Sequence, residues 1–139
     1  MRQSDIKKQF ETADTADFPD RAKLLLMCVN KTVEWPHLTL LDAVRYSWKV
    51  SPDRADGADY VLAVAYGLIL GVYEVEKWMA ANRENFPDIP EDHGNWKNQK
   101  GRYGFRGNKA PKNVWDGYVG KRVPDEWRNH GAPIRYVHC

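Results

Sequence analysis

The C-terminal third of the chain combines cationic and aromatic side chains in a pattern that could hold a phosphorylated ligand. Residues 97–139 contain 10 Lys and Arg against 3 Asp and Glu, a net charge of +7. The cations are Lys97, Lys100, Arg102, Arg106, Lys109, Lys112, Lys121, Arg122, Arg128 and Arg135. The aromatic residues between them are Tyr103, Phe105, Trp115, Tyr118, Trp127 and Tyr136. Cations neutralise phosphate and aromatic rings stack on bases, so this segment predicts binding of a nucleic acid or a nucleotide. A solvated basic face is the alternative interpretation.

Nine residues are the candidates for ligand contact because each is a ring, or a cation beside a ring or a glycine turn. They are Trp48, Lys49, Arg102, Tyr103, Phe105, Arg106, Lys121, Arg122 and Arg135. Arg would bind phosphate by bidentate contacts. A ring from Trp48, Tyr103 or Phe105 would stack on the base. Trp48 has a second interpretation as a core residue, because it falls in helical register with Leu40 and Val44.

Catalytic patterns are weaker than these binding patterns. Ser47 and Ser51 lack a Gly-x-Ser-x-Gly elbow, and Cys28 lies in an apolar run that favours an inert thiol. Glu74 and Glu76 share one face of a predicted strand, and an enzyme acting on a nucleotide could use them or a histidine. The sequence therefore favours a non-catalytic binding module over a nucleotide-processing enzyme.

Glycines at positions 101, 104 and 107 superficially resemble a phosphate-binding loop, but the strand–loop–helix context and a Lys-Ser/Thr pair are missing. With two cysteines and four histidines, the chain contains no Cys-x-x-Cys and no His-Glu-x-x-His motif. We expect neither a metal site nor a cofactor. Cys28 and Cys139 form no disulfide framework, which favours a reducing compartment.

The overall composition fits one globular domain. The chain has 139 residues, of which 42% are hydrophobic, and no apolar run approaches the ~20 residues that span a bilayer. The N-terminus lacks a secretory signal pattern, so we expect a cytoplasmic protein without a membrane partner. Residues 1–96 carry 11 basic and 16 acidic side chains, a net charge of −5 that complements the C-terminal +7. This complementarity predicts a symmetric homo-oligomer, although packing of the two segments within one chain would satisfy the same charges.

The N-terminal residues 1–20 are predicted to form a loosely attached arm, and residues 21–139 a single α+β domain. The arm contains a polar helix over 3–12, with Ile6 and Phe10 on one face. The apolar run 22–29 favours a buried strand by its length, while its composition would equally suit a helix.

A helix is predicted to begin at Thr39, with Asp42 three residues later in the pattern of a capping box, and to end before Pro52. Trp48 would lie inside this helix. A turn-rich connection over 51–58 follows.

The apolar runs 60–65 and 68–75 flank Tyr66-Gly67 and predict a central β-hairpin with its turn at that dipeptide. Gly71 inside the second run suggests a bulge or a close approach. Residues 76–82 would add a short turn of helix.

The last elements are a long surface loop over 83–101 and a strand over 102–107, with Tyr103 and Phe105 on one side. A helix from Pro111 to Gly120 and a final strand over 133–137 follow.

The segment Tyr60–Trp78, with Gly71, Val72 and Val75, resembles the strand pair of small PUA-like modules of the ASCH and EVE type. That resemblance implies a compact β-barrel with flanking helices and a pocket for a nucleobase or nucleotide. Residues 43–136 also resemble uncharacterised small proteins of bacteria and their phages. The similar pieces are Arg45–Trp48, Gly67–Tyr73, Gly104–Gly107, Tyr118–Pro124 and Pro133–Tyr136.

The predicted fold is thus α+β, with a small, curved, mixed or antiparallel sheet as in a PUA-like barrel, and flanking helices. The predicted function is non-covalent binding of a phosphate-bearing ligand. A phage-type sponge that sequesters a nucleotide immune signal is an alternative of the same class, and a nucleotide-processing enzyme is another.

Overall fold

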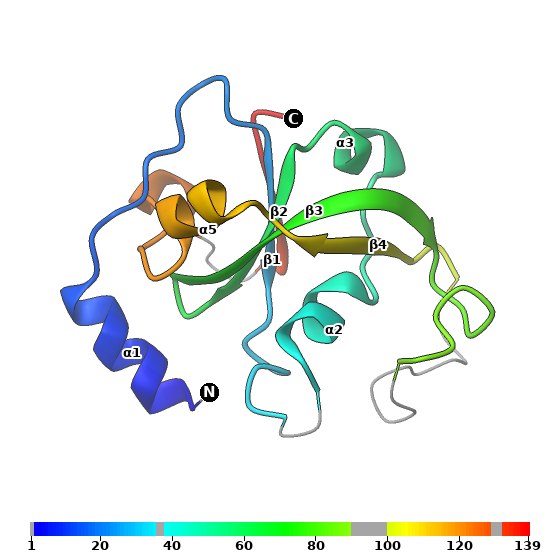
Figure 1. The fold of residues 1–139 in the computed structure, drawn as a ribbon, viewed down its shortest axis with the longest axis horizontal. Helices are drawn as coiled ribbons and strands as arrows, with labels where there is room; N and C mark the ends of the chain where they lie inside the picture. The colour runs from blue at the N-terminus through cyan, green and yellow to red at the C-terminus, as the bar shows by residue number, and fades with distance from the viewer. Residues whose placement is uncertain (1, 36–37, 90–99, 129–131) are drawn as a thin grey trace.

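The computed structural model describes residues 2–35, 38–89, 100–128 and 132–139. It shows an α+β fold in which helices flank a five-stranded mixed sheet (Figure 1). The strands are β1 (Leu24–Cys28), β2 (Tyr60–Ala65), β3 (Leu68–Ala80), β4 (Tyr103–Lys109) and β5 (Ile134–Val137). The helices are α1 (Gln3–Thr12), α2 (Leu40–Arg45), α3 (Pro52–Asp56), α5 (Lys112–Tyr118) and the 3₁₀ helix η2 (Asp125–Trp127).

The strand order across the sheet is β4-β3-β2-β1-β5. β1 and β2 are parallel, and the other three neighbouring pairs are antiparallel. The two edge strands, β4 and β5, do not pair with each other, so the sheet over the described residues is open. The predicted α+β class with a mixed sheet is confirmed, whereas the closure of a PUA-like barrel is not seen.

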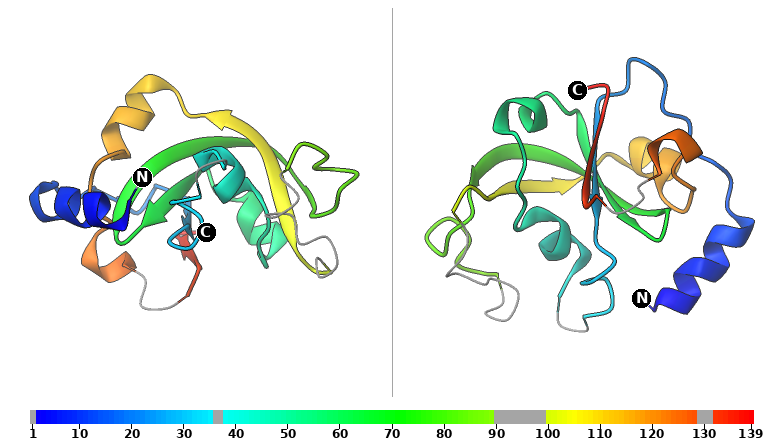
Figure 2. Two further views of the ribbon diagram at one scale, coloured as in Figure 1. Left: turned by 90° about the horizontal axis from the view of Figure 1, so that it is seen from below. Right: turned by 180° about the vertical axis from the view of Figure 1, so that it is seen from behind.

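Alternating side chains of the central strands build a separate core on each face of the sheet. In β1, Leu25 and Met27 join a cluster with Ile6 of α1 and Val44 of α2. The intervening Leu24 and Leu26 face the other side. There α5 covers the sheet through Val114, Trp115 and Tyr118. In Figure 2, β3 arches over α2 while α5 lies on the other side of the arch. β1 therefore has two buried faces, which explains its uninterrupted apolar sequence.

The predicted hairpin is confirmed. β2 and β3 are antiparallel and turn at Tyr66 and Gly67, whose φ angles of 50° and 81° are those of a two-residue hairpin turn. The register shifts where Ala63 pairs with Gly71 and Val64 with Ile69, which leaves Leu70 as an extra residue. The bulge expected at Gly71 therefore lies at Leu70 and Gly71.

The predicted helical turn over 76–82 is wrong, because β3 continues to Ala80. β4 pairs with this part of β3 and supplies the hydrogen bonds that a helix would otherwise provide within itself. A second register shift, between Val75 and Lys77, makes Glu76 another extra residue. Two bulges in one strand increase its twist and bend, and β3 curls around α2.

The helix predicted from Thr39 to Pro52 is half right. Thr39 caps α2 as expected, since its side-chain oxygen accepts a hydrogen bond from the backbone N–H of Asp42 at 3.1 Å. The helix ends at Arg45, and Trp48 instead pairs with Tyr103 as an isolated β-bridge. Pro52 opens the short helix α3 inside the segment expected to be a turn. Proline suits a first helical position, where its missing N–H costs nothing.

The N-terminal helix is confirmed, but it is not loosely attached. Ile6 is fully buried in the core on the α2 side of the sheet. Arg122 donates hydrogen bonds to the carbonyl oxygens of Phe10 (2.6 Å) and Glu11 (2.7 Å) at the C-terminal end of α1.

The predicted strand over 133–137 and the predicted helix after Pro111 are both present, as β5 and α5. Gly120 has a φ of 84°, which a glycine adopts readily after the end of a helix. The predicted loop over 83–101 lies partly outside the described residues. No helix in the described part of the chain is long and apolar enough to cross a membrane.

Candidate nucleic-acid interface

The nine predicted ligand residues do not form one site. Trp48, Lys49, Arg102 and Tyr103 meet where the segment after α2 reaches the start of β4. Arg106 lies further along β4. Three of the predicted cations lie elsewhere. Lys121 and Arg122 are beside Leu68, at the opposite end of β3, and Arg135 is in β5.

We call the first region the distal ribbon surface and define it as residues 45–49, 76–83 and 100–106. Its framework is the pairing of β3 with β4, extended by the bridge between Trp48 and Tyr103. The two bridge residues exchange backbone hydrogen bonds of 2.9 and 2.8 Å. The Trp48 indole Nε1 also donates to the carbonyl oxygen of Val44 at 2.7 Å. Both rings are half-buried and fixed in position.

Four cations lie on neighbouring segments of this surface. Lys49 follows Trp48 and Arg102 precedes Tyr103, so if the antiparallel register of this isolated bridge continued by one residue, Lys49 would lie opposite Arg102. On the ribbon itself, Lys77 pairs directly with Arg106. Like charges in directly opposed positions repel each other, and an anion between them converts the repulsion into attraction.

The Lys77–Arg106 pair faces away from the core. Their strand neighbours Trp78 and Phe105 point inward and pack edge to face, with ring centroids 5.2 Å apart. Because side chains alternate along a strand, Lys77 and Arg106 point outward, and both are exposed. Sequence analysis missed Lys77, since its position opposite Arg106 depends on the bulge at Glu76.

The distal ribbon surface carries an excess of positive charge. Its cations are Arg45, Lys49, Lys77, Arg83, Lys100, Arg102 and Arg106. Glu76 is its one carboxylate, and that side chain accepts a hydrogen bond from Asn108 at 3.3 Å. Arg45 is neutralised by Asp42 and Asp88, both at 2.8 Å. Arg102 donates to the carbonyl oxygen of Ser47 at 3.2 Å, which holds its guanidinium beside the bridge. Lys49, Lys77, Lys100, Arg102 and Arg106 create a positive field over this end of the ribbon.

Tyr46 connects this surface to a small separate core with Phe86 and Ile89. Its ring packs edge to face on Phe86, with centroids 5.2 Å apart. Burial raises the pKa of the Tyr46 hydroxyl, and the positive charge of Arg83 opposes part of that shift. Tyr46 therefore stays a neutral phenol near neutral pH and adds no negative charge to the surface.

Phe105, one of the rings predicted to stack on a base, is fully buried. Its ring belongs to the core on the α2 side of the sheet and packs against Trp78. Within this structure it offers no face to a ligand. Its alternation with Arg102 and Arg106 in the sequence is the alternation of a strand with one buried face.

Three predicted cations have other surroundings. The guanidinium of Arg122 binds the end of α1 and lies 4.5 Å from the centre of the Phe10 ring. Lys121 is half-buried, and its carbonyl oxygen accepts a hydrogen bond from Ile69 at 2.9 Å. Arg135 is half-buried in β5, and its Nε has no hydrogen-bond partner among the described residues.

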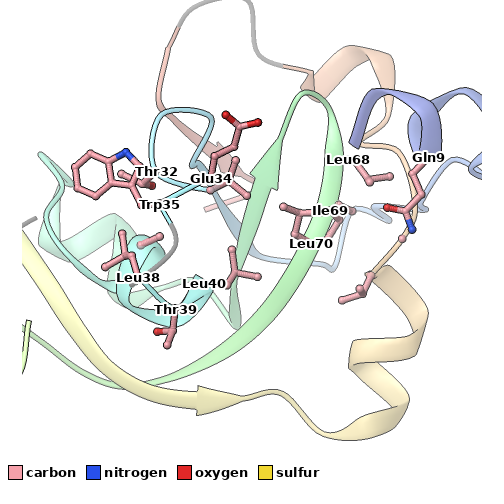
Figure 3. Close-up of a pocket in the computed structure, with 14 residues that line it drawn as sticks. Gln9, Thr32, Glu34, Trp35, Leu38, Thr39, Leu40, Leu68, Ile69 and Leu70 are labelled. Atoms are coloured by element: carbon pink, nitrogen blue, oxygen red, sulfur yellow. The ribbon is translucent and has the colours of Figure 1, made fainter. Parts of the chain in front are cut away.

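A cavity lies elsewhere on the molecule, and none of the nine candidates is in its wall. It has a volume of about 380 Å³ and lies between α1, the segment 32–35, the start of α2 and the start of β3 (Figure 3). Sequence analysis proposed none of the residues that line this cavity as ligand contacts. Trp35, an indole near other apolar residues, was the available signal. The described residues contain no group of three or more potential metal ligands.

No protein-family model, curated protein or solved structure matches this chain. The resemblances to PUA-like modules and to small phage proteins therefore stay predictions.

Proposed function

We propose that this protein binds the phosphate groups of a nucleic acid through the distal ribbon surface, without covalent chemistry. The observation that carries the proposal is the cross-strand pairing of Lys77 with Arg106, together with two more cations, Lys49 and Arg102, that flank the Trp48–Tyr103 bridge. No carboxylate forms an ion pair with any of these four cations among the described residues. A bound phosphate relieves the repulsion among these cations.

The separation of the two pairs suits an extended strand. Arg102 and Arg106 are four residues apart along one chain, which corresponds to roughly 13 Å in a β-conformation. An extended single-stranded nucleic acid can place two phosphates over such a distance, with one further phosphate between them. The half-buried rings of Trp48 and Tyr103 lie beside the first pair, where a base could stack.

The open form of this surface favours a nucleic acid over a free nucleotide. A nucleotide site is ordinarily concave, and no Lys or Arg is among the described residues that line the cavity of about 380 Å³. The resemblance of residues 60–78 to PUA-like modules adds support, because it implies recognition of a nucleobase. The barrel that this resemblance implies stays a prediction.

The test is fluorescence anisotropy with labelled single-stranded DNA and RNA over a series of salt concentrations. We expect affinity to fall as salt rises, because binding releases counterions from the phosphates. The variants Lys49→Glu and Arg106→Glu should each weaken binding and reduce the slope of log K against log salt by about one. Trp48→Ala should cost about 1–3 kcal/mol if the ring stacks on a base.

Lys8→Glu is the matched control. Lys8 is an exposed lysine on α1, at the other end of the molecule, so its reversal should leave affinity nearly unchanged. Equal losses for Lys8→Glu and Arg106→Glu would show diffuse attraction without a site. No binding of either oligonucleotide at low salt would refute the proposal.

Native mass spectrometry of the protein purified from its host distinguishes the alternatives. Retention of a small nucleotide, released unchanged on denaturation, would favour a sponge. Conversion of an added nucleotide would favour an enzyme. The same spectrum gives the oligomer mass and so tests the predicted homo-oligomer.

A further inference from the structure

The cavity next to β3 has the size of a small-molecule site. Its volume of about 380 Å³ falls within the range of roughly 300–1,000 Å³ typical of ligand pockets. α1 contributes Gln9, the segment after β1 contributes residues 32–35, and β3 contributes residues 68–70 (Figure 3). It does not overlap the distal ribbon surface, which begins further along β3.

Hydrogen bonds on several sides of the cavity hold its walls in place. The backbone N–H of Val33 donates to the carbonyl oxygen of Val29 at 2.9 Å, which fixes the turn after β1. On the opposite wall, Gly120 donates to the carbonyl oxygen of Ile69 at 2.8 Å. The backbone N–H of Gln3 donates to the Glu34 carboxylate and ties α1 to the same turn. A preformed cavity loses less entropy on binding than one that a ligand must organise.

The lining is mainly apolar. Figure 3 shows Trp35 and Leu38 on one side and Leu68 and Leu70 on the other. Apolar walls and an indole ring favour an aromatic ligand, because stacking and burial of its faces both contribute. Thr32, Thr39 and Gln9 add side-chain groups that can form hydrogen bonds.

Charge decides which aromatic ligand fits. Among the described residues that line the cavity, Glu34 is the one charged side chain and none is a Lys or Arg. A phosphate or carboxylate would meet this carboxylate without a compensating cation, whereas a protonated amine would be attracted. The cavity therefore has the opposite charge preference to the distal ribbon surface.

We propose that this cavity binds a planar aromatic amine, with the ring between Trp35 and the leucines of β3 and the ammonium group at the Glu34 carboxylate. This inference does not depend on phosphate binding elsewhere on the molecule.

Three probes with the same ring and different charges test it. They are tryptamine, which is cationic, indole, which is neutral, and indole-3-acetate, which is anionic. Binding is measured by calorimetry and by shifts of the backbone amide signals in NMR spectra. We expect tryptamine to bind most tightly and indole-3-acetate most weakly, with shifts at residues 32–35 and 68–70. Absence of binding by all three at millimolar concentration, or tightest binding of the anion, would overturn the proposal.

Substitutions separate the contribution of the ring from that of the charge. Leu70→Trp and Thr32→Trp fill the cavity from opposite walls, and each should abolish binding of both indole and tryptamine. Glu34→Gln should weaken tryptamine about two- to fivefold, as expected for one exposed ion pair, and leave indole unchanged. Glu126→Gln, a change of another exposed carboxylate outside the cavity, is the control. Unchanged tryptamine binding in both filled variants would show that it binds elsewhere.

Discussion

The two ends of β3 carry the same kinds of side chain, but the partners of these side chains within the protein differ between the ends. At the Leu68 end, Arg122 and Arg128 lie over the ring of Phe10, at 4.5 and 4.8 Å from its centre. Arg122 binds two backbone carbonyls, and Arg128 forms an ion pair with Asp125 at 2.6 Å. At the Ala80 end, Lys49, Lys77 and Arg106 are exposed, and no ion pair or hydrogen bond of their side chains is formed among the described residues.

An arginine beside an aromatic ring therefore has a different role at each end of β3. At the Leu68 end both arginines contact the N-terminal helix, and each also has a hydrogen-bond or ion-pair partner within the protein. At the Ala80 end the cations repel one another and can gain by meeting an anion. Composition cannot separate these cases, but the distribution of partners can.

The largest expected effect on stability concerns Phe105, whose ring lies at the Ala80 end and is buried in the core. Phe105→Ala should lower the free energy of unfolding by about 3–5 kcal/mol, because it empties a fully buried site. Urea denaturation measures this change. Phe10→Ala at the other end should cost less, since Phe10 is only half-buried. Phe105→Leu should fold and bind oligonucleotide normally. Loss of binding in that folded variant would show that Phe105 contributes to the binding site.

The next effect tests the attachment of α1. Arg122→Ala should cost about 1.5–3 kcal/mol, the usual value for hydrogen bonds made by a charged group. Amide hydrogen exchange should also become faster in α1. Arg106→Ala, a loss of an exposed arginine at the other end, should change stability by less than about 0.5 kcal/mol. Equal losses of stability from the two substitutions would show that the arginines at the two ends of β3 do not differ in their structural role.

Gly71 lies between the two ends, at the bulge. A Cβ atom there would approach the Tyr73 ring to 2.9 Å and Leu40 Cδ2 to 3.0 Å. Gly71→Val should therefore destabilise the protein by about 1–3 kcal/mol, as overpacked sites do. Thermal unfolding measures this. Gly117→Val is the control, because nothing lies within 4 Å of a Cβ atom at that position. A melting temperature unchanged by Gly71→Val would show that the bulge tolerates a side chain.

The smallest expected effect is an increase in stability, whereas the substitutions above decrease it. Lys49→Glu replaces a repulsive cross-strand pair with an attractive one opposite Arg102, and should stabilise the protein by roughly 0.2–1 kcal/mol. The same substitution should weaken binding of oligonucleotide. Lys49→Gln should give about half of the gain in stability. If Lys49→Glu were destabilising, the two cations would not oppose each other as the bridge implies.

Local patterns predicted the elements that local interactions decide. Tyr66-Gly67 fixes the hairpin turn, Thr39 caps α2, and Ile6 marks the buried face of α1. Patterns failed where a distant strand decides. The segment 76–80 is a strand because β4 pairs with it, and Trp48 leaves its predicted helix to pair with Tyr103.

The candidate site was predicted in part for the same reason. Lys49, Arg102 and Tyr103 were found as cations and rings close in sequence to glycine or to tryptophan. Lys77 was not found, since only the register of β3 with β4 brings it to Arg106. Arg122 was predicted to bind a ligand, and nothing in its sequence neighbourhood shows that its guanidinium is hydrogen-bonded to the end of α1.

The two extra residues of β3 also determine how this gene could vary in length. Leu70 and Glu76 have no counterpart on the neighbouring strands. Loss of either codon would leave every other residue with its present partner and face, whereas loss of the Val72 codon would require Leu70 and Gly71 to take new partners on β2. Natural or engineered relatives that are one residue shorter in this strand are therefore expected to lack one of these two positions.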